Sequence, residues 1–84
     1  MAARLTLYVR DGCNLCDEAA VVLDAMIGAD AYDKADISRS DDLLFGYAHR
    51  IPVLAVDGVD RLDAPITAPD IRALLDSVEG VRGA

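Results

Sequence analysis

The chain has 84 residues, enough for one small domain with a thin core, and we expect that single domain to span residues 1–84. Hydrophobic residues make up 54% of the chain, which excludes intrinsic disorder. The net charge of −7 disfavours binding to nucleic acid or to an anionic membrane surface. No stretch approaches the roughly 18 consecutive apolar residues of a membrane span. Because the first residues show no signal-peptide pattern, we expect a cytoplasmic protein, and structural disulfides are rare in that compartment.

The first half of the chain predicts a strand, a helix and a second strand. Residues 5–9 read LTLYV, an alternating pattern of strand-forming residues, and residues 10–12 are typical of a turn. Beyond Cys13, apolar residues recur at spacings of three and four, which predicts a helix ending at Gly28. The predicted apolar stripe of this helix is Leu15, Ala19, Val22, Leu23 and Met26. Residues 32–37 predict a polar strand, whose alternating charges suit the edge of a sheet.

The second half predicts a short helix, a β-hairpin and a final helix. Ser40 is placed to cap the short helix. Residues 51–56 form an apolar run typical of a buried strand, Asp57-Gly58 is a strong signal for a tight turn, and residues 59–62 form the returning strand. Residues 67–70, TAPD, resemble a capping box at the start of the last helix. The predicted order of elements is therefore β-α-β-α-β-β-α.

The two cysteines of the sequence form one motif, Cys13-Asn14-Leu15-Cys16, at the start of the predicted first helix. A spacing of three residues places both sulfurs on one side of the first turn, within reach of a disulfide. Unpaired N–H groups at a helix start stabilise an anion, so we expect Cys13 to be the nucleophile and the less exposed Cys16 to be the resolving thiol. Two cysteines and one histidine are too few for a closed zinc site, and we expect no resident metal or bound cofactor.

A proline, Pro52, stands at the beginning of the predicted buried strand, where its missing N–H is normally disfavoured. Taken together, LTLYVRDGCNLCDEA, the polar strand, YAHRIPVLAVDG and the last capped helix resemble the thioredoxin-like superfamily, most closely its small glutaredoxin-like family. The resemblance covers nearly the whole chain. It implies an α/β fold with a four-stranded mixed sheet of order 2-1-3-4, flanked by three helices, and a cis-proline that faces the two cysteines.

The resemblance also implies a function. It describes a small thiol-disulfide oxidoreductase that reduces or exchanges protein disulfides or glutathione mixed disulfides, takes its electrons from a thiol reductant, and acts as a monomer. Cys13 attacks the substrate and Cys16 releases the product, with glutathione as one candidate co-substrate. Substrate contacts are expected from Arg10, Asn14, Leu15, Arg50, Ile51, Pro52, Thr67 and Asp70.

Two features depart from the pattern of the glutaredoxins. Asn14-Leu15 stands where these proteins usually carry Pro-Tyr between the cysteines, and the glycine pair that grips the γ-glutamyl end of glutathione is absent before the last helix. Two other functions therefore stay open. One is a redox-inert module that binds a peptide or protein partner, and the other is a carrier of a metal or an iron-sulfur cluster.

Overall fold

Residues 3–78, the part of the chain that the computed structural model describes, form four strands and three α-helices. The elements are β1 (Leu5–Val9), α1 (Asn14–Ile27), β2 (Tyr32–Asp36), α2 (Asp41–Tyr47), β3 (Val53–Val56), β4 (Val59–Asp63) and α3 (Ala68–Ser77). This is the predicted order of elements. Two short 3₁₀ helices that the sequence did not predict, η1 (Ala29–Ala31) and η2 (Ile37–Arg39), precede and follow β2.

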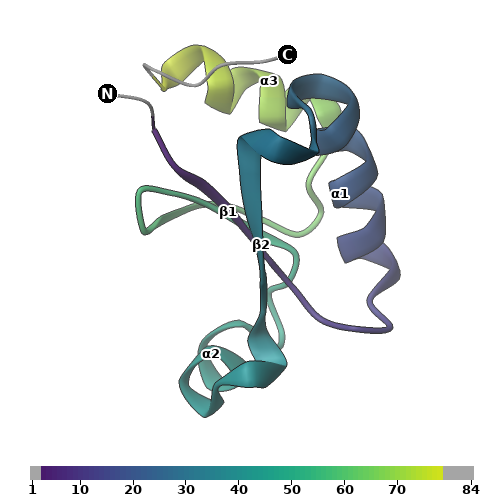
Figure 1. Cartoon of the computed structure of the whole chain (residues 1–84), viewed down its shortest axis with the longest axis vertical. Coiled ribbons are helices and arrows are strands. Elements are labelled where there is room, and N and C mark those ends of the chain that lie inside the picture. The colour runs from purple at the N-terminus through teal and green to yellow at the C-terminus, as the bar shows by residue number, and fades with distance from the viewer. Residues whose placement is uncertain (1–2, 79–84) are drawn as a thin grey trace.

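The sheet has the order β2-β1-β3-β4, which confirms the order implied by the family resemblance. β1 pairs in parallel with β2, whereas β1 with β3 and β3 with β4 are antiparallel pairs. The polar strand β2 is an edge strand, as predicted. In Figure 1, α1 and α3 lie together at one end of the molecule, and α2 lies apart from them at the other end.

The larger core fills the space between α1, α3 and one face of the sheet, because every second residue of a strand points to the same face. Its buried members are Leu5, Leu7, Ala19, Ala20, Leu23, Ile27, Tyr32, Leu54, Val56, Ile71 and Leu74. The opposite face of the sheet carries Tyr8, whose ring stacks on Tyr47 of α2 at a centroid distance of 4.3 Å. The helices therefore cover both faces of the sheet.

Local sequence signals set most of the element ends. Ser40 caps α2, as predicted, by accepting a hydrogen bond from the Leu43 N–H. Asp57 and Gly58 both have positive φ, 50° and 82°, as a type I′ hairpin turn requires. β2 ends one residue earlier than predicted, because the Asp36 carboxylate accepts hydrogen bonds from Ser38 and turns the chain into η2.

The buried stripe of α1 differs from the predicted one by a rotation of about one residue. The structure buries Cys16, Ala19, Ala20, Leu23 and Ile27. Leu15, predicted to be part of the stripe, is 49% exposed, whereas Cys16 is 1% exposed. Several apolar residues of α1 lie at the border between its buried and exposed faces. The apolar stripe in the sequence is therefore wider than the face that packs on the sheet. The second cysteine is thus a member of the buried face.

Leu23 and Val21 lie on opposite faces of α1, so they make a matched pair for testing the core. Leu23 is fully buried and Val21 is 67% exposed. We expect Leu23→Ala to lower the free energy of unfolding by about 2–5 kcal/mol, because a cavity replaces buried side-chain atoms. Val21→Ala should change it by less than about 0.5 kcal/mol. Urea unfolding followed by circular dichroism measures both, and equal effects of the two substitutions would contradict this packing.

Candidate redox site

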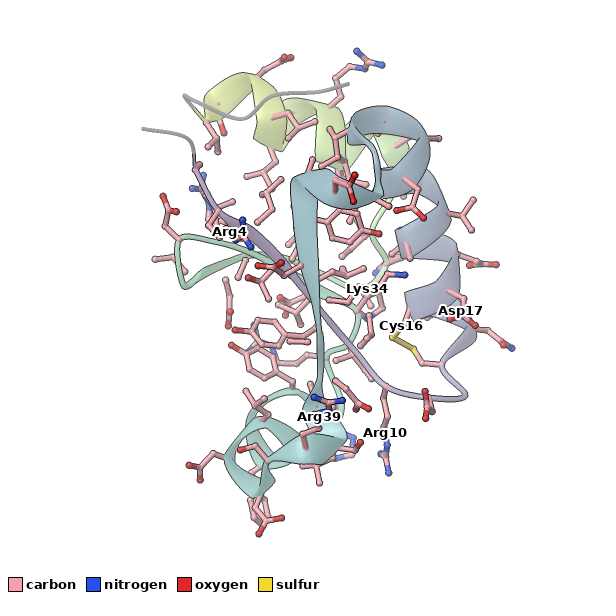
Figure 2. All side chains as sticks on the ribbon, in the orientation of Figure 1. Arg4, Arg10, Cys16, Asp17, Lys34 and Arg39 are labelled. Atoms are coloured by element: carbon pink, nitrogen blue, oxygen red, sulfur yellow. A yellow bond between two sulfur atoms is a disulfide. The ribbon has the colours of Figure 1, made fainter. Side chains whose placement is uncertain are left out.

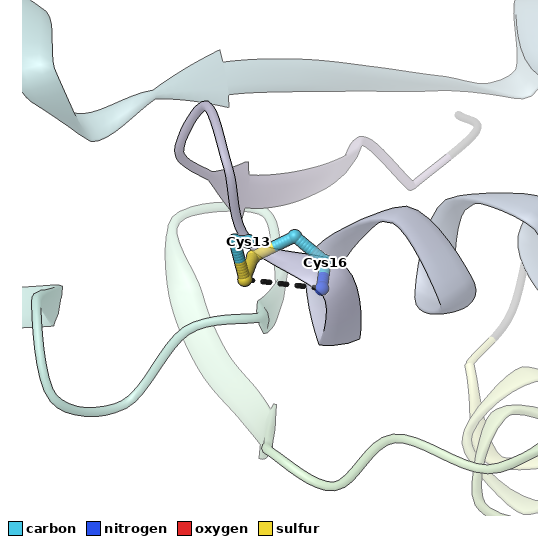
Figure 3. The surroundings of a disulfide bond; sticks show 2 residues. All are labelled: Cys13 and Cys16. Atoms are coloured by element: carbon cyan, nitrogen blue, oxygen red, sulfur yellow. Dashed lines mark hydrogen bonds between the residues drawn. A yellow bond between two sulfur atoms is a disulfide. The ribbon is translucent and has the colours of Figure 1, made fainter.

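The two cysteines lie at the N-terminus of α1 and form a disulfide (Figure 3). Cys13 is the N-cap of the helix, and its sulfur accepts a hydrogen bond of 3.1 Å from the Cys16 N–H. The two Cα atoms are 5.2 Å apart, within the range that a disulfide needs. Cys13 is half-buried, whereas the Cys16 side chain faces the core. Cys13 is thus the more accessible sulfur of the pair.

The loop that follows β1 places Cys13 at this position. The Cys13 N–H donates to the Arg10 carbonyl at 3.3 Å, which closes a tight turn. Gly12, inside that turn, has a φ of 78°, a conformation that glycine adopts at little cost. The side chains predicted to contact substrate here, Arg10, Asn14 and Leu15, are all exposed. Asn14 and Leu15 lie between the two cysteines in the sequence, and the Arg10 carbonyl closes the turn before them.

Pro52 lies at the same end of the sheet as the cysteines. Val53 pairs with Tyr8 in the antiparallel β1–β3 ladder, so Pro52 comes just beyond that pair, where β1 runs into the cysteine loop. The Ile51–Pro52 peptide bond is cis and Pro52 is fully buried, whereas Ile51 is half-buried. β3 is paired on both sides, so a peptide that docks here would contact the segment before the strand.

Arg50 is held by two carboxylates of β4. Its guanidinium donates to Asp63 at 3.0 Å and to Asp60 at 3.1 Å, and it lies over the ring of Tyr47 at 5.2 Å from the centroid. The hydrogen bonds to Asp63 and Asp60 raise the pKa of Arg50, and those from Arg50 lower the pKa of Asp63. Arg50 would have to exchange these partners to bind a carboxylate of glutathione.

The hydroxyl of Tyr47 completes this cluster by donating to Asp60 at 2.8 Å. Burial, followed by the hydrogen bond to Asp60, raises the pKa of Tyr47 to about 12. The N–H groups of Arg50 and Ile51 both donate to the Tyr47 carbonyl. The cluster therefore ties the segment before Pro52 to α2 on one side and to β4 on the other.

Thr67 and Asp70 form the predicted capping box at the start of α3. The Asp70 N–H donates to the Thr67 hydroxyl oxygen at 3.3 Å, and the Thr67 N–H donates to the Asp70 carboxylate at 3.4 Å. The Thr67 hydroxyl also donates to that carboxylate at 2.9 Å. Both side chains are exposed, and each is engaged by the other. A substrate contact at this position would compete with the helix cap.

A polar cavity of about 340 Å³ lies beside Cys16, and sequence reasoning did not find it. Charged side chains from the loop, from α1 and from β2 line it: Arg10, Asp11, Asp17, Lys34 and Asp36. The sequence did contain one indication that Lys34 and Asp36 line this cavity. They stand two and four residues after Tyr32 in the same strand, so all three side chains point to the same face of the sheet. Tyr32 is buried against α1, where its hydroxyl donates to Asp24 at 2.7 Å.

Within residues 3–78, no three His, Cys, Asp or Glu side chains are placed together to hold a metal ion. None of the helices in that part of the chain is long and apolar enough to cross a membrane.

Comparisons with known proteins place these features in a family. The family model described as "Glutaredoxin-like domain (DUF836)" matches residues 4–76. The crystal structure of a structural genomics target protein, XcR50 from X. campestris, is similar with a TM-score of 0.69 and 41% sequence identity, and the match covers 88% of this chain and 97% of that chain. The solution structure of XcR50 gives 0.69 and 42%, covering 95% and 99%. No curated protein matches the chain.

The ion pairs of Arg50 should make stability depend on pH in the acid range. The pKa of Asp63 is lowered from its ordinary 3.8, so the stabilisation from this pair is fully present above about pH 4 and is lost as the pH falls through the lowered pKa. We therefore expect Arg50→Gln to be less stable than wild type at neutral pH, with a difference that shrinks as the pH falls from 7 to about 2.5.

Arg61 provides the control, because it is exposed on the same strand as Asp60 and Asp63 and makes no ion pair within residues 3–78. Arg61→Gln removes the same charge and should lower the free energy of unfolding less at neutral pH. Urea unfolding at the two pH values gives the comparison, and a difference for Arg50→Gln that stays constant with pH would contradict the pairing.

Proposed function

The chain belongs to the glutaredoxin-like domain family, and on this basis we propose that it is a small thiol-disulfide oxidoreductase. The observation that carries the proposal is the disulfide between Cys13 and Cys16, in which one sulfur caps a helix and the other is buried behind it. A purely structural disulfide would add little to the free energy of unfolding here, because it closes a loop of only a few residues. At the surface end of a helix, the Cys13 sulfur is instead accessible to a thiol or a disulfide of another molecule.

In the reduced protein, the Cys13 thiolate attacks one sulfur of a substrate disulfide, forms a mixed disulfide and expels the first substrate thiol. Cys16 then attacks the Cys13 sulfur, forms the Cys13–Cys16 bond and expels the second thiol. A thiol reductant returns both cysteines to the reduced state. The Cys16 N–H, aimed at the Cys13 sulfur, favours negative charge there, and the helix dipole adds about 0.3–1 kcal/mol.

Three carboxylates oppose that stabilisation. Asp11, Asp17 and Glu18 are exposed close to Cys13 in the sequence, and each disfavours a thiolate at the same sulfur. We therefore propose a moderately acidic Cys13 of the kind found in reducing thioredoxin-like proteins. This balance favours the reduction of disulfides in substrates over the oxidation of substrate thiols.

The surroundings of the cysteines favour disulfides in proteins as substrates. Three of the side chains expected to contact substrate are engaged within the chain: Arg50 by the β4 carboxylates, and Thr67 and Asp70 by each other. An extended segment of a protein substrate instead has Leu15, which is 49% exposed, and the chain before Pro52 to contact. We propose that the protein acts as a monomer in the cytoplasm, with glutathione as a candidate electron donor.

Single cysteine substitutions test the proposed chemistry. We expect Cys13→Ser to lose at least about 99% of the activity in the reduction of insulin disulfides, because no nucleophile remains. Cys16→Ser should lose insulin reduction but keep forming a mixed disulfide through Cys13. Insulin precipitation gives the rate, and mass spectrometry detects the trapped adduct.

Running the same assay with two electron sources, glutathione with its reductase or thioredoxin reductase, identifies the physiological kind of donor. A Cys13→Ser protein as active as wild type would overturn the proposal. The proposal would also be overturned if the wild-type protein failed to reduce insulin with glutathione, with thioredoxin reductase and with a small dithiol.

A further inference from the structure

Cys16 has almost no contact with bulk solvent, yet it borders water-accessible space. The residue is 1% exposed, and one wall of the 340 Å³ polar cavity is formed by it. Figure 2 shows Lys34 and Cys16 between β2 and the first turn of α1, with Asp17 on that turn. The cavity thus lies on the side of Cys16 that faces the edge strand.

The register of β2 places Lys34 on this cavity. Tyr32, two residues earlier on the same face, contacts α1 through hydrogen bonds to Asp24 and to the Ala20 carbonyl. Cys16 is one helical turn before Ala20, toward the start of α1. Lys34 is two residues after Tyr32 along β2, and β2 runs toward that same end of the helix. Lys34 is the only lysine of the sequence, and within residues 3–78 it takes part in no ion pair.

The proposed oxidoreductase reaction includes a step in which the charge of Lys34 would have an effect. Cys16 must lose its proton before it attacks the mixed disulfide at Cys13, and burial away from water resists that ionisation. A positive charge on the same cavity favours the thiolate. We propose, on the basis of the proposed function, that Lys34 is a positioning residue for the resolving step, and that the cavity beside it carries the proton of Cys16 to solvent.

Three of the other charged groups of the cavity oppose the ionisation of Cys16. Asp11 from the loop, Asp17 from α1 and Asp36 from β2 are carboxylates, and Arg10 is the second cation. Hydrogen bonds from Ser38 lower the pKa of Asp36, so this carboxylate keeps its charge across the neutral range. Without Lys34, Cys16 would face three carboxylates and one arginine. Lys34 is therefore one of the two cations on the cavity that offset these carboxylates, and it is the one on the edge strand.

A neutral disulfide, 2,2′-dithiodipyridine, measures the two steps separately. Cys13 attacks it, forms a Cys13–thiopyridine disulfide and releases one thiopyridone. The Cys16 thiolate then attacks the Cys13 sulfur, forms the Cys13–Cys16 bond and releases the second thiopyridone, while its proton goes to water. The two electrons of the dithiol thus reduce one reagent molecule to two thiopyridones. The first phase depends on reagent concentration, and the second, intramolecular phase does not.

We expect Lys34→Gln to raise the apparent pKa of the second phase by about 0.5–1 unit, a modest change because the lysine is exposed and its charge is screened. A less acidic thiol is also a better nucleophile, with a Brønsted coefficient of about 0.4–0.5. The second phase should therefore be about two- to fourfold slower below its pKa and about two- to threefold faster on the alkaline plateau. This crossing of the two pH profiles is a signature that a damaged fold would not produce.

Two variants serve as controls. Lys34→Arg keeps the charge and should retain the wild-type profile. Arg61→Gln removes a charge of the same sign from β4, the opposite edge strand of the sheet. At the usual strand spacing β4 lies about 14 Å from β2, so this substitution should change neither phase. Cys16→Ser, which should release one equivalent only, identifies the second phase.

The outcomes separate the two proposals. If the wild type releases one equivalent, it has no resolving step, and both the proposed function and this inference are overturned. If it releases two and the second-phase profile of Lys34→Gln matches that of wild type, the proposed function stands and the assignment of Lys34 is wrong. An equal change in both phases would also overturn it, because Lys34 would then act on the whole turn instead of on Cys16.

Discussion

The hydrogen bond from the Cys16 N–H to the Cys13 sulfur depends on Cys13 being the N-cap of α1. That cap in turn requires the tight turn at Gly12, which brings the chain out of the central strand β1. The helix is anchored through the buried face that begins with Cys16 itself. One of the two sulfurs is therefore part of the hydrophobic core while the other remains at the surface. This asymmetry suits the proposed reaction, in which the two cysteines take different parts.

The two faces of the sheet support different parts of the site. The core between α1, α3 and the sheet fixes the cysteine helix. On the other face, the rings of Tyr8 and Tyr47 stack, and Arg50 joins Tyr47 to carboxylates of β4. That second cluster holds the segment before Pro52. The cysteines and the proline are thus positioned by separate sets of contacts that meet at one end of the sheet.

Short-range signals made much of the fold predictable, as the cap at Ser40 and the turn at Asp57-Gly58 show. The strand order followed only from the family resemblance, because alternation within a strand does not identify its neighbours. The commitment of Arg50 to Asp63, 13 residues away, depends on the β3–β4 register. The place of Lys34 beside Cys16 likewise depends on the parallel pairing of β1 with β2. Pairings of this kind leave no mark within one segment of sequence.

The central claim is that Cys13 and Cys16 cycle between dithiol and disulfide under cellular conditions. The reduction potential of the pair tests it most directly, measured by equilibrating the protein with glutathione redox buffers, alkylating free thiols in acid and weighing the products by mass spectrometry. We predict a potential above about −300 mV, so that both forms are populated across buffers of physiological composition. A pair that stays fully oxidised in all of them, with a potential below about −300 mV, would be a structural disulfide and would contradict the claim.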